Sequence, residues 1–152
     1  MLAALLLAAA PLWAATPLTQ ADLKPLAEDD YDAKTAALNK LTQAPAEQAG
    51  PILKALQDDA LQYAPSVGMV RQDGDKTVDA VTGKPVTVKA DELESLTLNN
   101  SLRAIVDSAA SSLELQSPDI AVRTQAISTL FDQPENASRA AVEAARKAEA
   151  DA

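Results

Sequence analysis

The segment Leu96-Thr-Leu-Asn-Asn-Ser-Leu-Arg103 opens the clearest helical pattern in the chain. Apolar side chains then recur at three- to four-residue spacing, at Leu102, Val106, Ala109 and Leu113. This spacing places them on one face of a helix, which is expected to be buried. An asparagine before a helix accepts a hydrogen bond from a free N–H of the first turn. We therefore expect Asn100 to cap this helix, with Asn99 as the alternative.

Arg103 falls in the first turn of this helix, where the positive end of the helix dipole disfavours a cation. A carboxylate partner would offset that cost, and Asp91, Glu92 and Glu94 are nearby in the sequence. The segment is therefore interpreted first as a structural helix start and second as a partner-binding motif.

The segment Ser117-Pro-Asp-Ile-Ala-Val-Arg123 has the composition of a second helix start. Ser117 is expected to cap it, Pro118 to take the first helical position, and Asp119 to favour the positive helix end. The apolar stripe that follows, with Phe131 beside it, consists of Val122, Ala126, Ile127 and Leu130. One such unit does not bury its own face, so we expect a neighbour to cover it.

The first half of the chain predicts further helices. Thr19 and Asp22 resemble a capping box. One helix is expected to begin at Asp29–Asp32 and to end near Ala44-Pro45, and another to follow Gly50-Pro51 and to include Leu61. Two helices joined by this short connection would form an antiparallel hairpin.

The pattern changes after Tyr63-Ala-Pro65. Loose alternation and two turn signals predict short strands, at residues 67–71, 77–81 and 86–88. Residues 89–94 are interpreted as a charged connector. The expected fold class is mainly α, with short helical hairpins of the HEAT-like kind and a small β-hairpin insertion.

The expected organisation has four parts: a signal peptide at 1–15, an N-terminal helical region at 16–64, the β insertion at 65–90, and an incomplete helical repeat region at 91–152. The leader is apolar but shorter than the ~20 residues needed to cross a bilayer, which favours an exported, periplasmic protein. The alternative is a buried or uncleaved N-terminal helix. The tail from Ala137 offers mostly alanine and Val142 as its apolar face, so we expect it to fray.

Composition excludes several functional classes. The net charge of −9 argues against nucleic acid, whose phosphates require lysine and arginine. The chain has no cysteine and no histidine, so thiolate metal sites and the commonest general base are absent. Asp73-Gly-Asp75 resembles the start of a calcium loop, but its twelfth position is Lys84 where an EF-hand needs glutamate. We expect no enzyme activity, no metal site and no cofactor.

The two helix starts, Leu-Asn-Asn-x-Leu-Arg and Ser-Pro-Asp-x-x-Val-Arg in this order, resemble the N-terminal periplasmic region of the urea ABC transporter permease. That permease is the B-type subunit of the branched-chain amino acid permease class. The residues that carry the resemblance are Asn99, Asn100, Arg103, Asp119 and Arg123.

The resemblance implies a non-catalytic periplasmic domain that supports urea import. Its implied partners are other parts of the permease, the transporter ATPase subunits and a periplasmic binding protein. As part of a full-length permease it would be associated with the inner membrane. The alternative is a free periplasmic HEAT-like adaptor or scaffold unrelated to transport.

Overall fold

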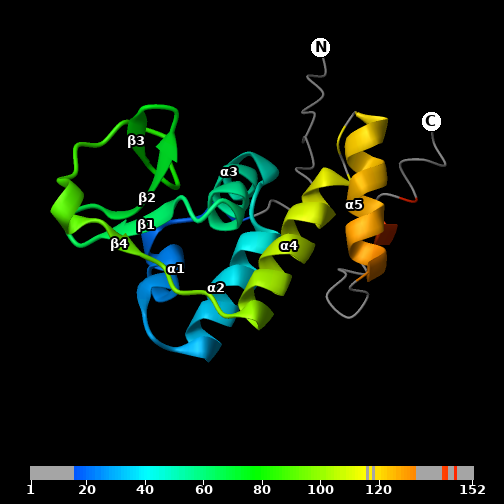
Figure 1. The fold of residues 1–152 in the computed structure, drawn as a ribbon, viewed down its shortest axis with the longest axis horizontal. Coiled ribbons are helices and arrows are strands. Elements are labelled where there is room, and N and C mark those ends of the chain that lie inside the picture. The colour runs from blue at the N-terminus through cyan, green and yellow to red at the C-terminus, as the bar shows by residue number, and fades with distance from the viewer. Residues whose placement is uncertain (1–15, 116, 118, 133–141, 144–145, 147–152) are drawn as a thin grey trace, which may run out of the picture.

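The computed structural model describes residues 16–115, 117, 119–132, 142–143 and 146. The predicted leader at 1–15 and most of the tail from Ala137 lie outside these residues. A small sheet occupies one end of the described structure and helix α5 (Ile120–Asp132) the other, with the other α-helices between them (Figure 1).

Four of the five described α-helices begin close to a predicted position. The α-helices are α1 (Gln20–Leu23), α2 (Tyr31–Gln43), α3 (Ala46–Gln57), α4 (Asn100–Glu114) and α5 (Ile120–Asp132), and the 3-10 helices are η1 (Lys24–Ala27) and η2 (Ala90–Glu92). The predicted start of α2 is confirmed, because the side chain of Asp30 caps it by accepting the N–H of Ala33 at 2.9 Å. Helix α3 begins earlier than predicted, so Pro51 lies inside it.

The sheet has four antiparallel strands in the order β3-β2-β1-β4. Its strands are β1 (Leu61–Ala64), β2 (Gly68–Asp73), β3 (Lys76–Asp79) and β4 (Glu94–Ser95). At the β3 edge of the sheet, Val78 also forms an isolated antiparallel bridge with Pro85. Residues 86–88, predicted as a strand, do not form one.

The predicted fold class, mainly α with HEAT-like hairpins, is wrong: the described residues combine five α-helices with a four-stranded antiparallel sheet. Leu61, assigned to a helix, begins β1, and Glu94, assigned to a connector, pairs with Tyr63 of β1. The predicted α2–α3 hairpin is replaced by packing of both helices on α4. Pairing between distant segments decides these assignments, and local pattern does not reveal it.

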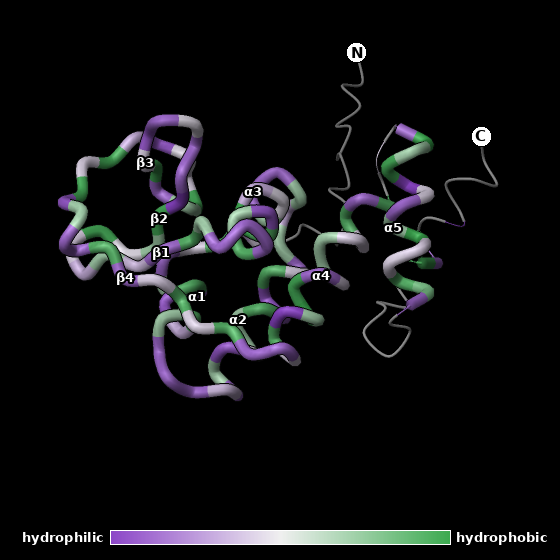
Figure 2. Tube along the Cα trace, viewed as in Figure 1, coloured by the Kyte–Doolittle hydropathy of each residue, from purple (hydrophilic) through white to green (hydrophobic). Residues whose placement is uncertain are grey.

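Helices and sheet share one hydrophobic core. The largest fully buried side chains are Leu23, Leu26, Leu38, Leu41, Ile52, Leu53, Met69, Val70, Leu102 and Val106. Met69 and Ala80 of the strand region belong to the same cluster as the helix leucines. Figure 2 shows hydrophobic and hydrophilic residues alternating along the trace in the helices and the sheet alike. A second, small cluster joins Leu115 to Ala126 and Leu130.

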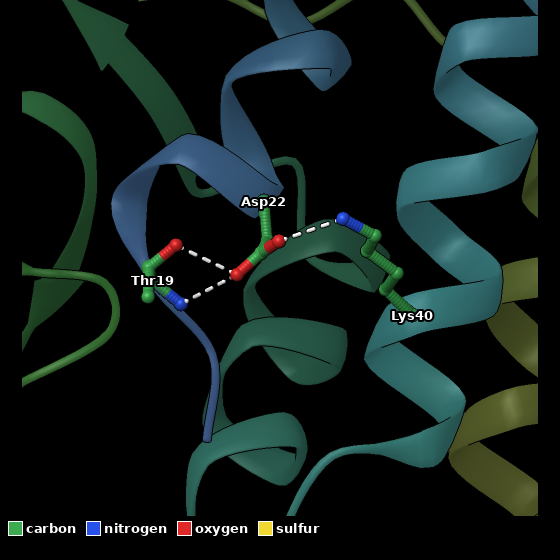
Figure 3. A network of polar contacts seen from close by, with 3 residues as sticks. All are labelled: Thr19, Asp22 and Lys40. Carbon is green, nitrogen blue, oxygen red and sulfur yellow. Dashed lines mark hydrogen bonds and ion pairs between the residues drawn. The ribbon is translucent and has the colours of Figure 1, made fainter. Parts of the chain in front are cut away.

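Asp22 ties the N-terminal segment to α2 (Figure 3). One of its carboxylate oxygens accepts the backbone N–H of Thr19 at 2.9 Å and the Thr19 hydroxyl at 2.6 Å. The other accepts the Nζ of Lys40 at 2.8 Å. The hydrogen bond from Lys40, followed by those from Thr19, lowers the pKa of Asp22 from 3.8 to about 2.

The side-chain amide of Gln20 attaches α1 to the sheet through three hydrogen bonds. Its Oε1 accepts the N–H of Met69 at 2.7 Å, and its Nε2 donates to the Met69 carbonyl and to Asp79, each at 2.9 Å. Gly68 is needed beside this contact, because its φ is +94° and a Cβ there would lie 2.6 Å from the Gln20 oxygen.

Candidate functional site

The start of α4 is capped by Asn99, whose Oδ1 accepts the N–H of Leu102 at 2.9 Å. Asn100 is the first helical residue, so the primary expectation was wrong and the alternative is confirmed. Leu102 is buried, as expected from the apolar stripe. The Leu-Asn-Asn-x-Leu-Arg motif therefore has a structural role at Asn99 and Leu102, while Asn100 is exposed.

Arg103 pairs with Asp59, and not with the carboxylates at 91–94 that the sequence suggested. Its Nη2 donates to Asp59 Oδ1 at 2.9 Å, and its Nη1 lies 3.5 Å from Asp59 Oδ2. Both side chains keep substantial exposure, 43% for Arg103 and 64% for Asp59. An exposed pair of this kind stabilises a fold by only about 0.2–1 kcal/mol.

Asp59 is held in an unusual backbone conformation. Its φ of 53° makes it the only described non-glycine residue with positive φ. It follows the C-cap of α3, where the N–H of Ala60 bonds to the Ala55 carbonyl at 2.7 Å and the N–H of Asp59 to the Leu56 carbonyl at 3.4 Å. These two bonds form a Schellman motif, whose left-handed position is usually glycine or asparagine.

Beside this ion pair lies a hollow of about 170 Å³, called here the Arg103 hollow. It is lined by Ala55, Leu56, Asp59, Leu61, Ser95, Leu96, Leu98 and Arg103. Its walls come from α3, β1, the segment around β4 and the first turn of α4. The lining is aliphatic except for Ser95 and the Asp59–Arg103 pair.

Lys34 fixes the chain segment that forms one wall of this hollow. Its side chain is buried, and its Nζ donates to the Thr97 carbonyl at 2.6 Å. A buried ammonium is costly without a partner, and this bond satisfies one of its three donors. Sequence reasoning missed Lys34 and Asp59. For Asp59 a signal existed: the Asp58-Asp59 pair ends the apolar pattern of α3, where a left-handed residue commonly stops a helix.

The Ser-Pro-Asp-x-x-Val-Arg motif, which starts at Ser117, connects α4 to α5. The carbonyl of Asp119 accepts the N–H of Arg123 at 3.1 Å, so Asp119 occupies the N-cap position expected for Ser117. Its Oδ1 also accepts the N–H of Ala121 at 2.8 Å. Ser117 instead accepts the N–H of Asp119 at 3.2 Å, and its carbonyl accepts Nη1 of Arg123 at 2.9 Å. The motif therefore has a structural role in this connection, while Pro118 lies outside the described residues.

The structure does not bring the two motifs together. Helix α4 has 15 residues, which corresponds to about 22 Å at 1.5 Å per residue. Arg103 lies in its first turn, and Asp119 and Arg123 follow its far end. The two motifs therefore lie at opposite ends of α4.

Helix α5 exposes large apolar side chains. Ile120, Ile127 and Phe131 are 70%, 58% and 82% exposed, and their spacing of seven and four residues places them on one side of the helix. This set is called here the α5 apolar face. Of the predicted stripe only Ala126 and Leu130 are buried, because α4 covers a different side of α5.

Other site types find no support in the described part of the chain. No group of three or more acidic side chains there is arranged to hold a metal ion. None of the helices that the structure describes has the length and apolar character needed to cross a membrane. The candidate sites are thus two surfaces, the Arg103 hollow and the α5 apolar face. Comparison with family models, with curated proteins and with solved structures found no match to this chain.

Proposed function

We propose that this chain is a non-catalytic, exported interaction domain that forms the N-terminal part of a urea-type ABC transporter permease. The observation that carries the proposal is the α5 apolar face. The resemblance of the two helix starts supplies the transporter context. On this proposal the domain supports urea import by binding other protein, while separate ATPase subunits supply the energy.

The α5 apolar face has the character of a protein-binding surface. Burying one Ile or Phe side chain stabilises an assembly by about 1.5–3 kcal/mol relative to leaving it in water. Phe131, the single phenylalanine of the chain, is the most exposed of the large apolar side chains described. Between Ile120 and Phe131 the one charged residue is Arg123, whose guanidinium bonds to the Ser117 carbonyl. An uncharged apolar helix face of this kind fits a second helix.

On this proposal the occupant of the α5 apolar face is an apolar helix of the permease itself. The face spans only about three helical turns, too little for a stable complex between separate proteins, which typically needs 1,000 Å² or more. Packing within one polypeptide avoids the translational cost of association. Contacts with the periplasmic binding protein would then involve other surfaces of the domain.

Site-specific photo-crosslinking in cells tests the proposal. A photoreactive amino acid replaces Phe131 in one variant and Gln125 in the control variant. Gln125 is exposed on the same helix, about 120° or more from the apolar face. We expect Phe131 to crosslink to permease segments and Gln125 not to do so. Crosslinks only to proteins outside the transporter would favour the alternative, a free exported adaptor. The absence of any crosslink specific to residue 131 would contradict both.

A functional assay complements this experiment. Phe131→Ser should lower urea uptake by the intact transporter while leaving the folded domain intact, because the side chain makes little contact within the described structure. Gln125→Ser is the matched control. Unchanged uptake in the Phe131→Ser strain would count against a role of this face in transport.

A further inference from the structure

Asp59 occupies a position that favours glycine, and its carboxylate faces outward to Arg103. An observed backbone outlier is a reason to look for function at that residue. The carboxylate pairs with Arg103 from 44 residues further along the chain. Because neither side chain is buried, fold stability alone gives little reason to have an aspartate in the left-handed region.

The Arg103 hollow is a depression that is open to solvent and has room for one aliphatic side chain. Its volume is about 170 Å³, and both polar and apolar atoms line it. Leu56, Leu61 and Leu98 are buried side chains with fixed surroundings, so this part of the wall is formed before any ligand arrives. Asp59 and Arg103 are the charged groups of its lining.

The charges beside this hollow leave a surplus of carboxylates. Asp58 is paired with Lys54, and Asp59 with Arg103. Asp107, one turn after Arg103 on α4, accepts the neutral amide of Gln57 at 3.0 Å and has no ion-pair partner among the described residues. Glu94, next to Ser95 of the lining, has no hydrogen bond or ion pair from its side chain within the described residues. Against these four carboxylates there are three cations, Lys54, Arg103 and the buried Lys34. One negative charge is left over, and a cation is the favoured neighbour of an aliphatic group bound here.

We propose that the Arg103 hollow is an anchor site for a partner polypeptide in which a Leu, Ile or Val side chain adjoins a Lys or Arg. The aliphatic side chain occupies the hollow, and the adjoining cation lies against Asp59, in competition with Arg103. This site is separate from the α5 apolar face and does not depend on the transporter assignment.

Methyl-detected NMR of the 152-residue chain tests the site with two small probes of similar size. 3-Methylbutylamine carries a branched aliphatic group with a cation, and 3-methylbutanoate carries a branched aliphatic group with an anion. We expect the amine to shift the methyl signals of Leu61, Leu96 and Leu98, with a dissociation constant of about 1–10 mM for a ligand of this size. The carboxylate probe should bind at least several-fold more weakly.

Asp59→Asn is the decisive variant, because asparagine tolerates the left-handed backbone and removes only the charge. It should reduce amine binding several-fold and reverse the preference towards 3-methylbutanoate, since Arg103 is then unpaired. Asp75→Asn, at the exposed β2–β3 turn, makes the same change in net charge elsewhere and should alter neither. Equal binding of both probes, or no shift of the hollow's methyl signals at tens of millimolar amine, would overturn the proposal.

Discussion

Replacing Asp59 by glycine and by alanine separates backbone strain from the ion pair at this residue. Both substitutions remove the carboxylate that Arg103 binds at 2.9 Å. They differ in the backbone, because a φ of 53° costs a residue with a Cβ roughly 1–2 kcal/mol and costs glycine nothing comparable. The two Schellman hydrogen bonds, from Ala60 to Ala55 and from Asp59 to Leu56, use backbone atoms and survive either change.

The expected magnitudes follow from these two terms. Asp59→Ala should lower the free energy of unfolding by about 0.2–1 kcal/mol through the lost ion pair. Asp59→Gly loses the same pair but relieves the strain, and part of that gain is offset by the greater entropy of glycine in the unfolded chain. Glycine should therefore be more stable than alanine by about 0.5–1 kcal/mol. For a protein of this size, 1 kcal/mol corresponds to about 2–4 °C in Tm.

Urea denaturation of both variants measures the difference, provided that their m-values agree. Asp58 supplies the matched control, because its φ of −86° lies in the right-handed region. There alanine should be at least as stable as glycine. If Asp59→Gly proves no more stable than Asp59→Ala, residue 59 does not adopt the left-handed conformation, and the argument for its special role fails.

Three further predictions concern the helix starts and the N-terminal segment. Asn99→Ala should cost about 1 kcal/mol of stability through the lost cap, whereas Asn100→Ala should change stability by less than about 0.5 kcal/mol; equal costs in chemical denaturation would contradict the cap assignment. Leu102→Ala should cost about 2–5 kcal/mol, because the side chain is fully buried, and a cost below 1 kcal/mol would show that its surroundings are loosely packed. The lowered pKa of Asp22 in the folded state stabilises the protein above its ordinary pKa of 3.8, and this contribution is lost as the pH falls from 3.8 to about 2. Denaturation curves across this range should therefore show a smaller pH dependence for Asp22→Asn, and an unchanged dependence would refute the assignment.

Local signals in the sequence were sufficient for much of the helical structure. The start of α2 at Asp30 and the helix start near Asn99 follow from side chains that bond within about three residues of themselves. The end of α2 before Pro45 follows from the backbone restriction that proline places on the residue before it. Apolar periodicity also identified Ile127 and Phe131 as part of the apolar pattern of α5, and the structure leaves both side chains exposed. These features depend on interactions between near neighbours in the chain.

The sheet and both candidate surfaces required the tertiary structure. Glu94 pairs with Tyr63, which lies 31 positions earlier in the chain (from 63 to 94). Arg103 bonds to Asp59, which lies 44 positions earlier. The side of α5 that stays exposed depends on how that helix packs on α4. The sequence by itself therefore determined where helices begin and which residues are apolar. Tertiary packing alone decided which of those residues stay exposed and which charges meet, because contacts between distant segments have no local signature.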